Sequence, residues 1–175
     1  MAVTKPCLVT QKSMVVVTML LTATSLWAGQ LERDPGGFHG IGWGANLAEV
    51  AELVPVQSSP RILEYEIKEG PPQVEGTPVD RLRFVSIEGQ FARVTIRYSG
   101  SETHRRIMEY LQNRFGPIDR TPGSMLRGMS QQFNWRGEET EANLTYDSYR
   151  QQGTVFIESR TLAPRFNDLL PEGAS

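Results

Sequence analysis

The stretch with the strongest chemical character is a pair of arginine-bearing segments, residues 81–87 and 91–98. Both alternate apolar with polar residues, which predicts two half-buried strands joined by a turn. We prefer a three-residue loop, 88–90, because a two-residue loop would move one apolar set to the wrong face. The residues then expected on one outer face, as a partner-binding surface, are Arg81, Arg83, Arg93, Arg97 and Phe91.

Arginines beside aromatic and apolar residues are typical of binding hot spots, so this face favours docking of an acidic or amphipathic partner. The alternative is an ordinary solvated sheet face. In that case Glu64 and Glu66, on a neighbouring strand, would neutralise the arginines.

The glycine-rich stretch 38–44 precedes an expected helix, a place where anions often bind. A dinucleotide fingerprint needs a third glycine at fixed spacing within a βαβ unit, and a P-loop needs Gly-Lys-Ser/Thr. Neither pattern is present. We therefore expect a structural role, with Phe38 and Trp43 buried while the glycines let the backbone bend.

Catalytic and metal-binding patterns are weak, so we expect no catalytic residues, no metal site and no cofactor. His39 and His104 are the only histidines, and neither belongs to an H-x-x-x-H motif. A G-x-S-x-G nucleophile motif is also missing. The acidic run 138–141 is typical of a solvated turn between strands.

The amino-terminal residues 1–28 have the composition of a signal peptide. Lys5 and Lys12 precede the apolar run 14–28, which is shorter than the roughly 20 residues that span a bilayer. We expect cleavage after Ala28 or Ser25, with an uncleaved anchor as the alternative. The prediction is an exported protein, periplasmic if the source is Gram-negative, without a membrane span after cleavage.

Cleavage changes both the cysteine count and the charge. The single cysteine, Cys7, leaves with the leader, so the mature chain has no disulfide or thiol nucleophile. The whole chain has 18 basic and 20 acidic residues; without Lys5 and Lys12 the balance is 16 against 20, a net charge of −4. This acidic balance argues against nucleic acid as a partner.

Periodicity predicts the elements that position these residues. Asn46 can cap a short helix over 47–54 that ends at Pro55, and a strong apolar stripe predicts a helix over 102–115. Strands are expected in the segments 61–70, where alternation runs from Leu63 to Lys68, 81–87, 91–98, 130–137, 141–149 and 153–160.

The order of these elements predicts an α+β fold, an antiparallel sheet of about six strands with two helices on one face. It also suggests a duplicated α-β-β-β unit. We divide the chain into a signal peptide (1–28), a flexible lead-in (29–37), one α+β domain (38–162) and an extended tail (163–175).

Three short motifs suggest a family. The start F-H-G-I-G-W-G (38–44), the helix end R-F-G-P (114–117) and F-N-W (133–135) resemble small exported bacterial domains of unknown function. Those domains carry F-x-G-I-x-W-G and a helix ending F-G-P, although Gly42 stands where they usually have a larger residue. More loosely, the element order is similar to envelope modules of the outer-membrane assembly lipoprotein and β-lactamase-inhibitor type, which implies binding without catalysis.

These observations predict a non-catalytic periplasmic binding or envelope-assembly module, with another envelope protein as its partner. One alternative is a carrier of a small apolar ligand, with a cavity lined by Phe84, Tyr65 and Leu111. The other is a hydrolase in which His39 or His104 converges with carboxylates in one cleft.

Overall fold

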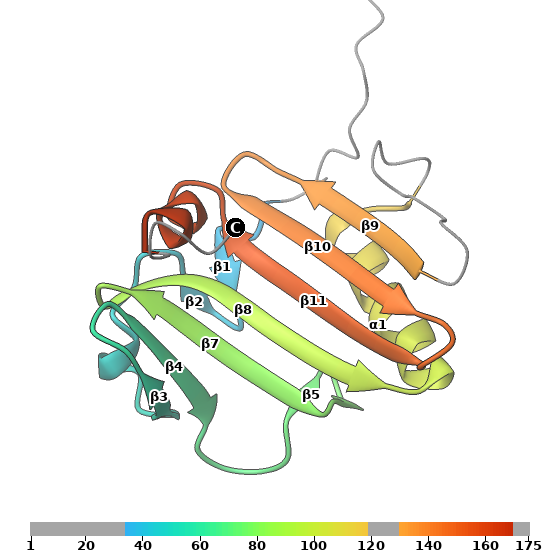
Figure 1. The fold of residues 1–175 in the computed structure, drawn as a ribbon, viewed down its shortest axis with the longest axis horizontal. Helices are drawn as coiled ribbons and strands as arrows, with labels where there is room; N and C mark the ends of the chain where they lie inside the picture. The colour runs from blue at the N-terminus through green and yellow to red at the C-terminus, as the bar shows by residue number, and fades with distance from the viewer. Residues whose placement is uncertain (1–33, 119–129, 170–175) are drawn as a thin grey trace, which may run out of the picture.

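The computed structural model describes residues 34–118 and 130–169, which are built around a seven-stranded antiparallel sheet (Figure 1). This confirms the α+β class, with one strand more than the six or so expected. In order across the sheet, the strands are β3 (Leu53–Ser58), β4 (Ile62–Ile67), β7 (Arg81–Ile87), β8 (Gln90–Ser99), β11 (Gln152–Ser159), β10 (Thr140–Asp147) and β9 (Ser130–Arg136).

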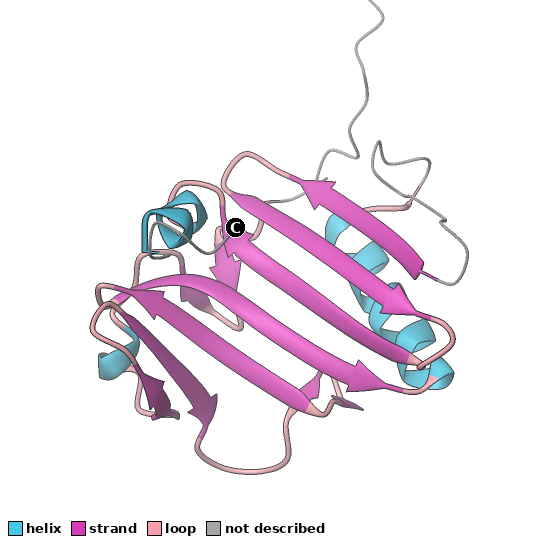
Figure 2. Cartoon of the chain, in the orientation of Figure 1, coloured by secondary structure: helices cyan, strands magenta, loops and turns pink. Residues whose placement is uncertain are grey.

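The helices and two small hairpins complete the described chain (Figure 2). Its single α-helix, α1 (Ser101–Phe115), lies behind the sheet in the view of Figure 1. The other elements are the 3-10 helices η1 (Leu47–Glu49) and η2 (Ala163–Leu169), the hairpin β1 (Gly37–Phe38) with β2 (Ile41–Gly42), and the hairpin β5 (Gln73–Val74) with β6 (Thr77–Pro78).

Helix α1 forms for the reasons that its sequence predicts. Ile107, Leu111 and Phe115 recur at helical spacing and are buried against the sheet. Gly116 ends the helix with a positive φ of 101°. The amino-terminal cap is Gly100 rather than Ser101, so the helix begins one residue earlier than expected.

Two of the quoted motifs meet at the end of this helix. The indole Nε1 of Trp135, on β9, donates a hydrogen bond of 3.0 Å to the carbonyl oxygen of Gly116. The Phe115 and Trp135 rings lie 6.4 Å apart, and Trp135 is only 1% exposed. F-G-P and F-N-W are therefore the two sides of one packing contact between α1 and the sheet edge.

The β7–β8 hairpin has the predicted register over its first five pairs, from Arg81 with Arg97 to Val85 with Arg93. The pairing then shifts at a β-bulge, and the loop contains two residues, Glu88 and Gly89, instead of three. Both have positive φ, 49° and 84°, as a type I′ turn requires. The bulge reconciles a two-residue turn with the correct apolar face.

The expected helix over 47–54 is wrong beyond its first turn. Asn46 does cap it, accepting a hydrogen bond from the backbone of Ala48. The chain becomes extended at Val50, however, because β3 pairs with β4 from Leu53 onward. Pro55 lies inside β3, on the sheet edge, next to a register shift that accommodates a proline.

The ends of the described chain also correct two expectations. Asp34 is tied to the β9–β10 turn by hydrogen bonds and Gly37 belongs to β1, so residues 34–37 are not a flexible lead-in, while residues 29–33 lie outside the described residues. Residues 163–169 form η2 instead of an extended tail. The proposed signal peptide, residues 1–28, lies outside the described residues. Within the part that the structure covers, no helix has the length and apolarity to cross a membrane.

Candidate functional site

The open face of the sheet, opposite α1, carries the predicted arginine surface. Alternation along β7 and β8 places all four arginines on this face, as the sequence predicted. They surround a hollow of about 390 Å3. Its lining is Gln57, Ile62, Glu64, Arg81, Arg83, Val85, Arg93, Thr95, Arg97, Phe156 and Phe166, which we call the arginine groove.

Two of the arginines make no ion pair with the described residues. Arg81 and Arg97 are direct partners across β7 and β8, and both are exposed. Within residues 34–118 and 130–169, neither side chain makes an ion pair or a hydrogen bond. Like charges directly opposite each other destabilise an antiparallel pair, so this end of the groove carries uncompensated positive charge.

The other two arginines are neutralised. Arg83 pairs with Glu66 and lies 3.5 Å from a Glu64 carboxylate oxygen, so the expected neutralisation by these glutamates applies to Arg83 alone. Arg93 donates to Glu158 at 2.7 Å. Positive charge is therefore concentrated at Arg81 and Arg97.

Aromatic rings form the opposite end of the groove. The Arg93 guanidinium lies 4.0 Å from the centre of the Phe166 ring and 5.2 Å from that of Phe156. η2 carries Phe166 and is held over the sheet by Arg165, which pairs with Glu88 and donates to Gln90 at 2.9 Å. The site thus has a cationic end and an aromatic end.

Phe91 is not part of this surface, and that prediction is wrong. The bulge turns its side chain to the core face, where it is fully buried, 4.7 Å from the Trp43 ring and 5.9 Å from the Phe84 ring. Its backbone pairs with the glycine-rich stretch, accepting from Gly44 at 2.8 Å and donating to Ala45 at 2.8 Å.

Sequence reasoning missed Phe156 and Phe166 instead. Alternation in β11 puts Phe156 on the same side as Thr154 and Glu158, a signal that could have been read. Phe166 had no such signal, because it lies in the proline-bearing segment that we expected to be extended.

The burial expected for the glycine-rich start is confirmed for Phe38 and is wrong for Trp43. Phe38 is buried, whereas Trp43 is only half-buried and donates to the Thr140 hydroxyl at 2.9 Å.

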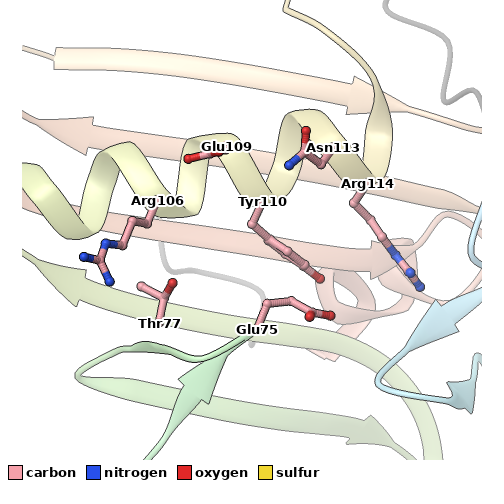
Figure 3. Close-up of a pocket in the computed structure, with 7 residues that line it drawn as sticks. All are labelled: Glu75, Thr77, Arg106, Glu109, Tyr110, Asn113 and Arg114. Atoms are coloured by element: carbon pink, nitrogen blue, oxygen red, sulfur yellow. The ribbon is translucent and has the colours of Figure 1, made fainter.

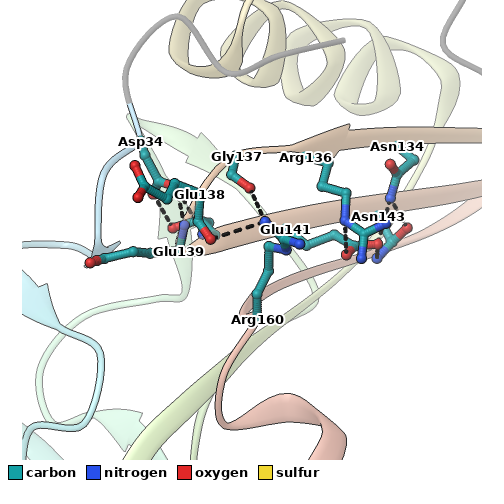
Figure 4. A network of polar contacts seen from close by, with 10 residues as sticks. Asp34, Asn134, Arg136, Gly137, Glu138, Glu139, Glu141, Asn143 and Arg160 are labelled. Carbon is teal, nitrogen blue, oxygen red and sulfur yellow. Dashed lines mark hydrogen bonds and ion pairs between the residues drawn. The ribbon is translucent and has the colours of Figure 1, made fainter. Parts of the chain in front are cut away.

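The acidic run spans the turn between β9 and β10 and the first two residues of β10, and its backbone is held there by hydrogen bonds (Figure 4). Asp34 accepts hydrogen bonds from the backbone nitrogens of Glu139, at 2.5 Å, and Thr140, at 3.0 Å. Arg160 donates to the Gly137 carbonyl at 2.6 Å. Partial burial alone would raise the pKa of the Asp34 carboxyl, but hydrogen bonds from Thr140 and from backbone amides outweigh it and lower that pKa. The Asp34 carboxylate therefore stabilises this turn.

The histidines lie apart from each other. His104 stacks on Tyr146, with ring centres 3.7 Å apart, and shares a hydrogen bond of 2.8 Å with the Tyr98 hydroxyl. Burial lowers its pKa, against a hydrogen bond with Gln131 that raises it. His39 is exposed and lines a hollow with Glu75. Among the described residues, no three His, Cys, Asp or Glu side chains form a group able to hold a metal ion.

The cavity expected for an apolar-ligand carrier is not formed by the three residues proposed for it. Phe84 and Leu111 are fully buried and Tyr65 is 5% exposed, all within the packed core.

Comparison of the chain with protein-family models, with curated proteins and with solved structures gives no significant match.

Proposed function

We propose that this protein is a non-catalytic binding module whose arginine groove docks an acidic, amphipathic segment of another envelope protein. The observation that carries the proposal is the facing pair Arg81 and Arg97, exposed and without an acidic partner in the described chain. A carboxylate-bearing partner would neutralise both guanidinium groups and relieve their mutual repulsion.

The rest of the groove favours an amphipathic partner over a simple anion. Phe156 and Phe166 offer aromatic surface beside the cationic end, and Ile62 and Val85 add apolar lining. Arginine and aromatic side chains together dominate the energetics of many interfaces. An acidic segment with apolar residues on one side would match both ends.

The location and the evolutionary origin remain proposals. Export rests on the signal-like composition of residues 1–28, with a periplasmic location in a Gram-negative source. The sheet order supports only the three-strand part of the proposed duplicated α-β-β-β unit, because the first of its two helices is reduced to the 3-10 turn η1. Strands β4, β7 and β8 are neighbours in the sheet, with the β5–β6 hairpin inserted between β4 and β7, and β9, β10 and β11 are neighbours in turn; the two sets meet where β8 pairs with β11.

A photocrosslinking amino acid at Thr95, on the floor of the arginine groove, tests the function in the native envelope. The same amino acid at Thr103, on α1, is the matched control. We expect the Thr95 derivative to capture one protein through a segment rich in Asp and Glu with apolar residues interspersed. Equal capture from Thr103, or a captured basic segment, would contradict the proposal.

A further inference from the structure

A second hollow lies between α1 and the β5–β6 hairpin, on the opposite side of the sheet from the arginine groove (Figure 3). It has a larger part of about 380 Å3 and an adjoining part of about 190 Å3 that reaches the β1–β2 turn. Glu75, Tyr110 and Arg114 line both parts, so they stand at the junction. We call this hollow the helix groove.

The two turns at the smaller part have unusual residues. His39-Gly40 and Glu75-Gly76 are two-residue hairpin loops in which both residues have positive φ. Type I′ turns of this kind strongly prefer Asn, Asp or Gly at the first position. His39, with φ of 55°, is a tolerated choice, whereas Glu75, with φ of 45°, is unfavourable there.

The Glu88-Gly89 turn between β7 and β8 is of the same type and shows what a glutamate can do at its first position. Glu88, with φ of 49°, uses its carboxylate to bind Arg61 at 2.5 Å and also pairs with Arg165. Glu75 has no ion pair and no side-chain hydrogen bond within the described chain. Strained positions persist where the side chain has a use, and the exposed Glu75 side chain lines both parts of the helix groove.

The groove also presents an unpaired cation. Arg114 makes no ion pair and no side-chain hydrogen bond with the described residues, although it lines the same hollow as Glu75. Arg106 and Glu109, farther along α1, are already paired with Glu102 and Arg105. The uncompensated charges of the groove are therefore one carboxylate and one guanidinium.

Tyr110 lies beside both charged residues, on the helix side of the hollow. Burial raises the pKa of its hydroxyl to about 12, an effect that Arg114 opposes and Glu75 reinforces. The phenol is therefore neutral at physiological pH. It offers both an aromatic surface and a hydrogen-bonding hydroxyl to a molecule in the groove.

We infer that the helix groove binds a free α-amino acid. Arg114 would take its carboxylate, Glu75 its ammonium group, and Tyr110 would pack against the Cα region. A free α-amino acid carries both charges on one carbon, whereas either end of a peptide carries one. Its side chain would extend into the larger part, beside Arg106 and Asn113.

Binding is measured by NMR titration of the labelled protein with each of the twenty common L-amino acids, with propionate and propylamine as singly charged controls. We expect at least one amino acid to shift the amides of Glu75, Tyr110 and Arg114. Both controls should bind at least tenfold more weakly. Binding of no amino acid at millimolar concentration, or equal binding of the singly charged controls, would overturn the inference.

Two substitutions of one residue separate function from strain. Glu75→Gln removes the charge and leaves an unfavourable turn residue, while Glu75→Asn removes the charge and supplies a favoured one. Both should weaken amino-acid binding at least tenfold, as should Arg114→Gln, and Glu75→Asn alone should raise Tm. Unchanged affinity in Glu75→Asn and Arg114→Gln would show that the strain has another cause. Arg81→Glu with Arg97→Glu should bind the amino acid normally, which keeps this test independent of the arginine groove.

Discussion

Arg81 and Arg97 face each other directly across β7 and β8, and no carboxylate of the described chain neutralises either side chain. The neighbouring Arg83 and Arg93, by contrast, are paired with Glu66 and Glu158 on adjacent strands of the same sheet. The unpartnered pair is thus a cost to folding that the binding proposal explains.

Removing one of the facing charges should stabilise the free protein. Arg97→Gln abolishes the repulsion with Arg81, and we expect a gain of about 0.2–1 kcal/mol in the free energy of unfolding. Urea denaturation at low and high salt checks this. The gain should shrink at high salt because screening weakens the repulsion in the parent protein. A loss of stability in Arg97→Gln would mean that the side chain has a structural role.

Trp43 and Trp135, the tryptophans of the two quoted motifs, should contribute differently to the free energy of unfolding. Trp135 is 1% exposed and donates to Gly116, so Trp135→Ala should cost about 3–5 kcal/mol of unfolding free energy. Trp43 is only half-buried, and Trp43→Ala should cost less. Denaturation of both variants by urea gives the comparison, and an equal or larger loss for Trp43→Ala would contradict the packing described.

His104 should make stability depend on pH. Burial lowers its folded-state pKa below the ordinary value of 6.5, so its contribution is complete above that pH. As the pH falls from 6.5 through the folded-state pKa, the unfolded chain takes up a proton first, and the protein loses stability. Thermal unfolding at a series of pH values should show this loss, and His104→Gln should reduce it. His39 is present in both proteins and serves as the internal control.

Gly153 should not tolerate a side chain. A Cβ atom there would overlap the ring of Tyr98, which lies over this glycine on the neighbouring strand. We expect Gly153→Ala to cost about 1–3 kcal/mol, the range for overpacked cores. The double variant with Tyr98→Leu should recover part of the loss in thermal unfolding, and a neutral Gly153→Ala would contradict the close approach.

Local patterns were sufficient for the arginine face and the main helix. Alternation fixed which side of β7 carries Arg81 and Arg83, and helical spacing identified Ile107 and Leu111 as buried. The prediction for Phe91 was wrong because a β-bulge shifts the alternation of side chains by one residue. Assigning faces by alternate residues is valid only for a strand without a bulge.

Long-range contacts decided what the sequence left open. Leu53 joins β3 because Ile67 is available as its strand partner, which local helix signals do not reveal. Phe166 reaches the arginine groove only because Arg165 anchors η2 at the β7–β8 turn. The helix groove depends likewise on two hairpins meeting α1, although the turn at Glu75-Gly76 is visible in the sequence.

The most direct test of the binding proposal is the affinity for an acidic amphipathic peptide, measured by fluorescence anisotropy against a basic peptide of the same pattern. The double variant Arg81→Glu with Arg97→Glu is compared with Arg105→Glu with Arg150→Glu, which changes the net charge equally but leaves the groove intact. We predict that the acidic peptide binds the parent protein and the second variant alike, and binds the groove variant at least tenfold more weakly. Equal affinity for all three proteins, or a preference for the basic peptide, would contradict the account.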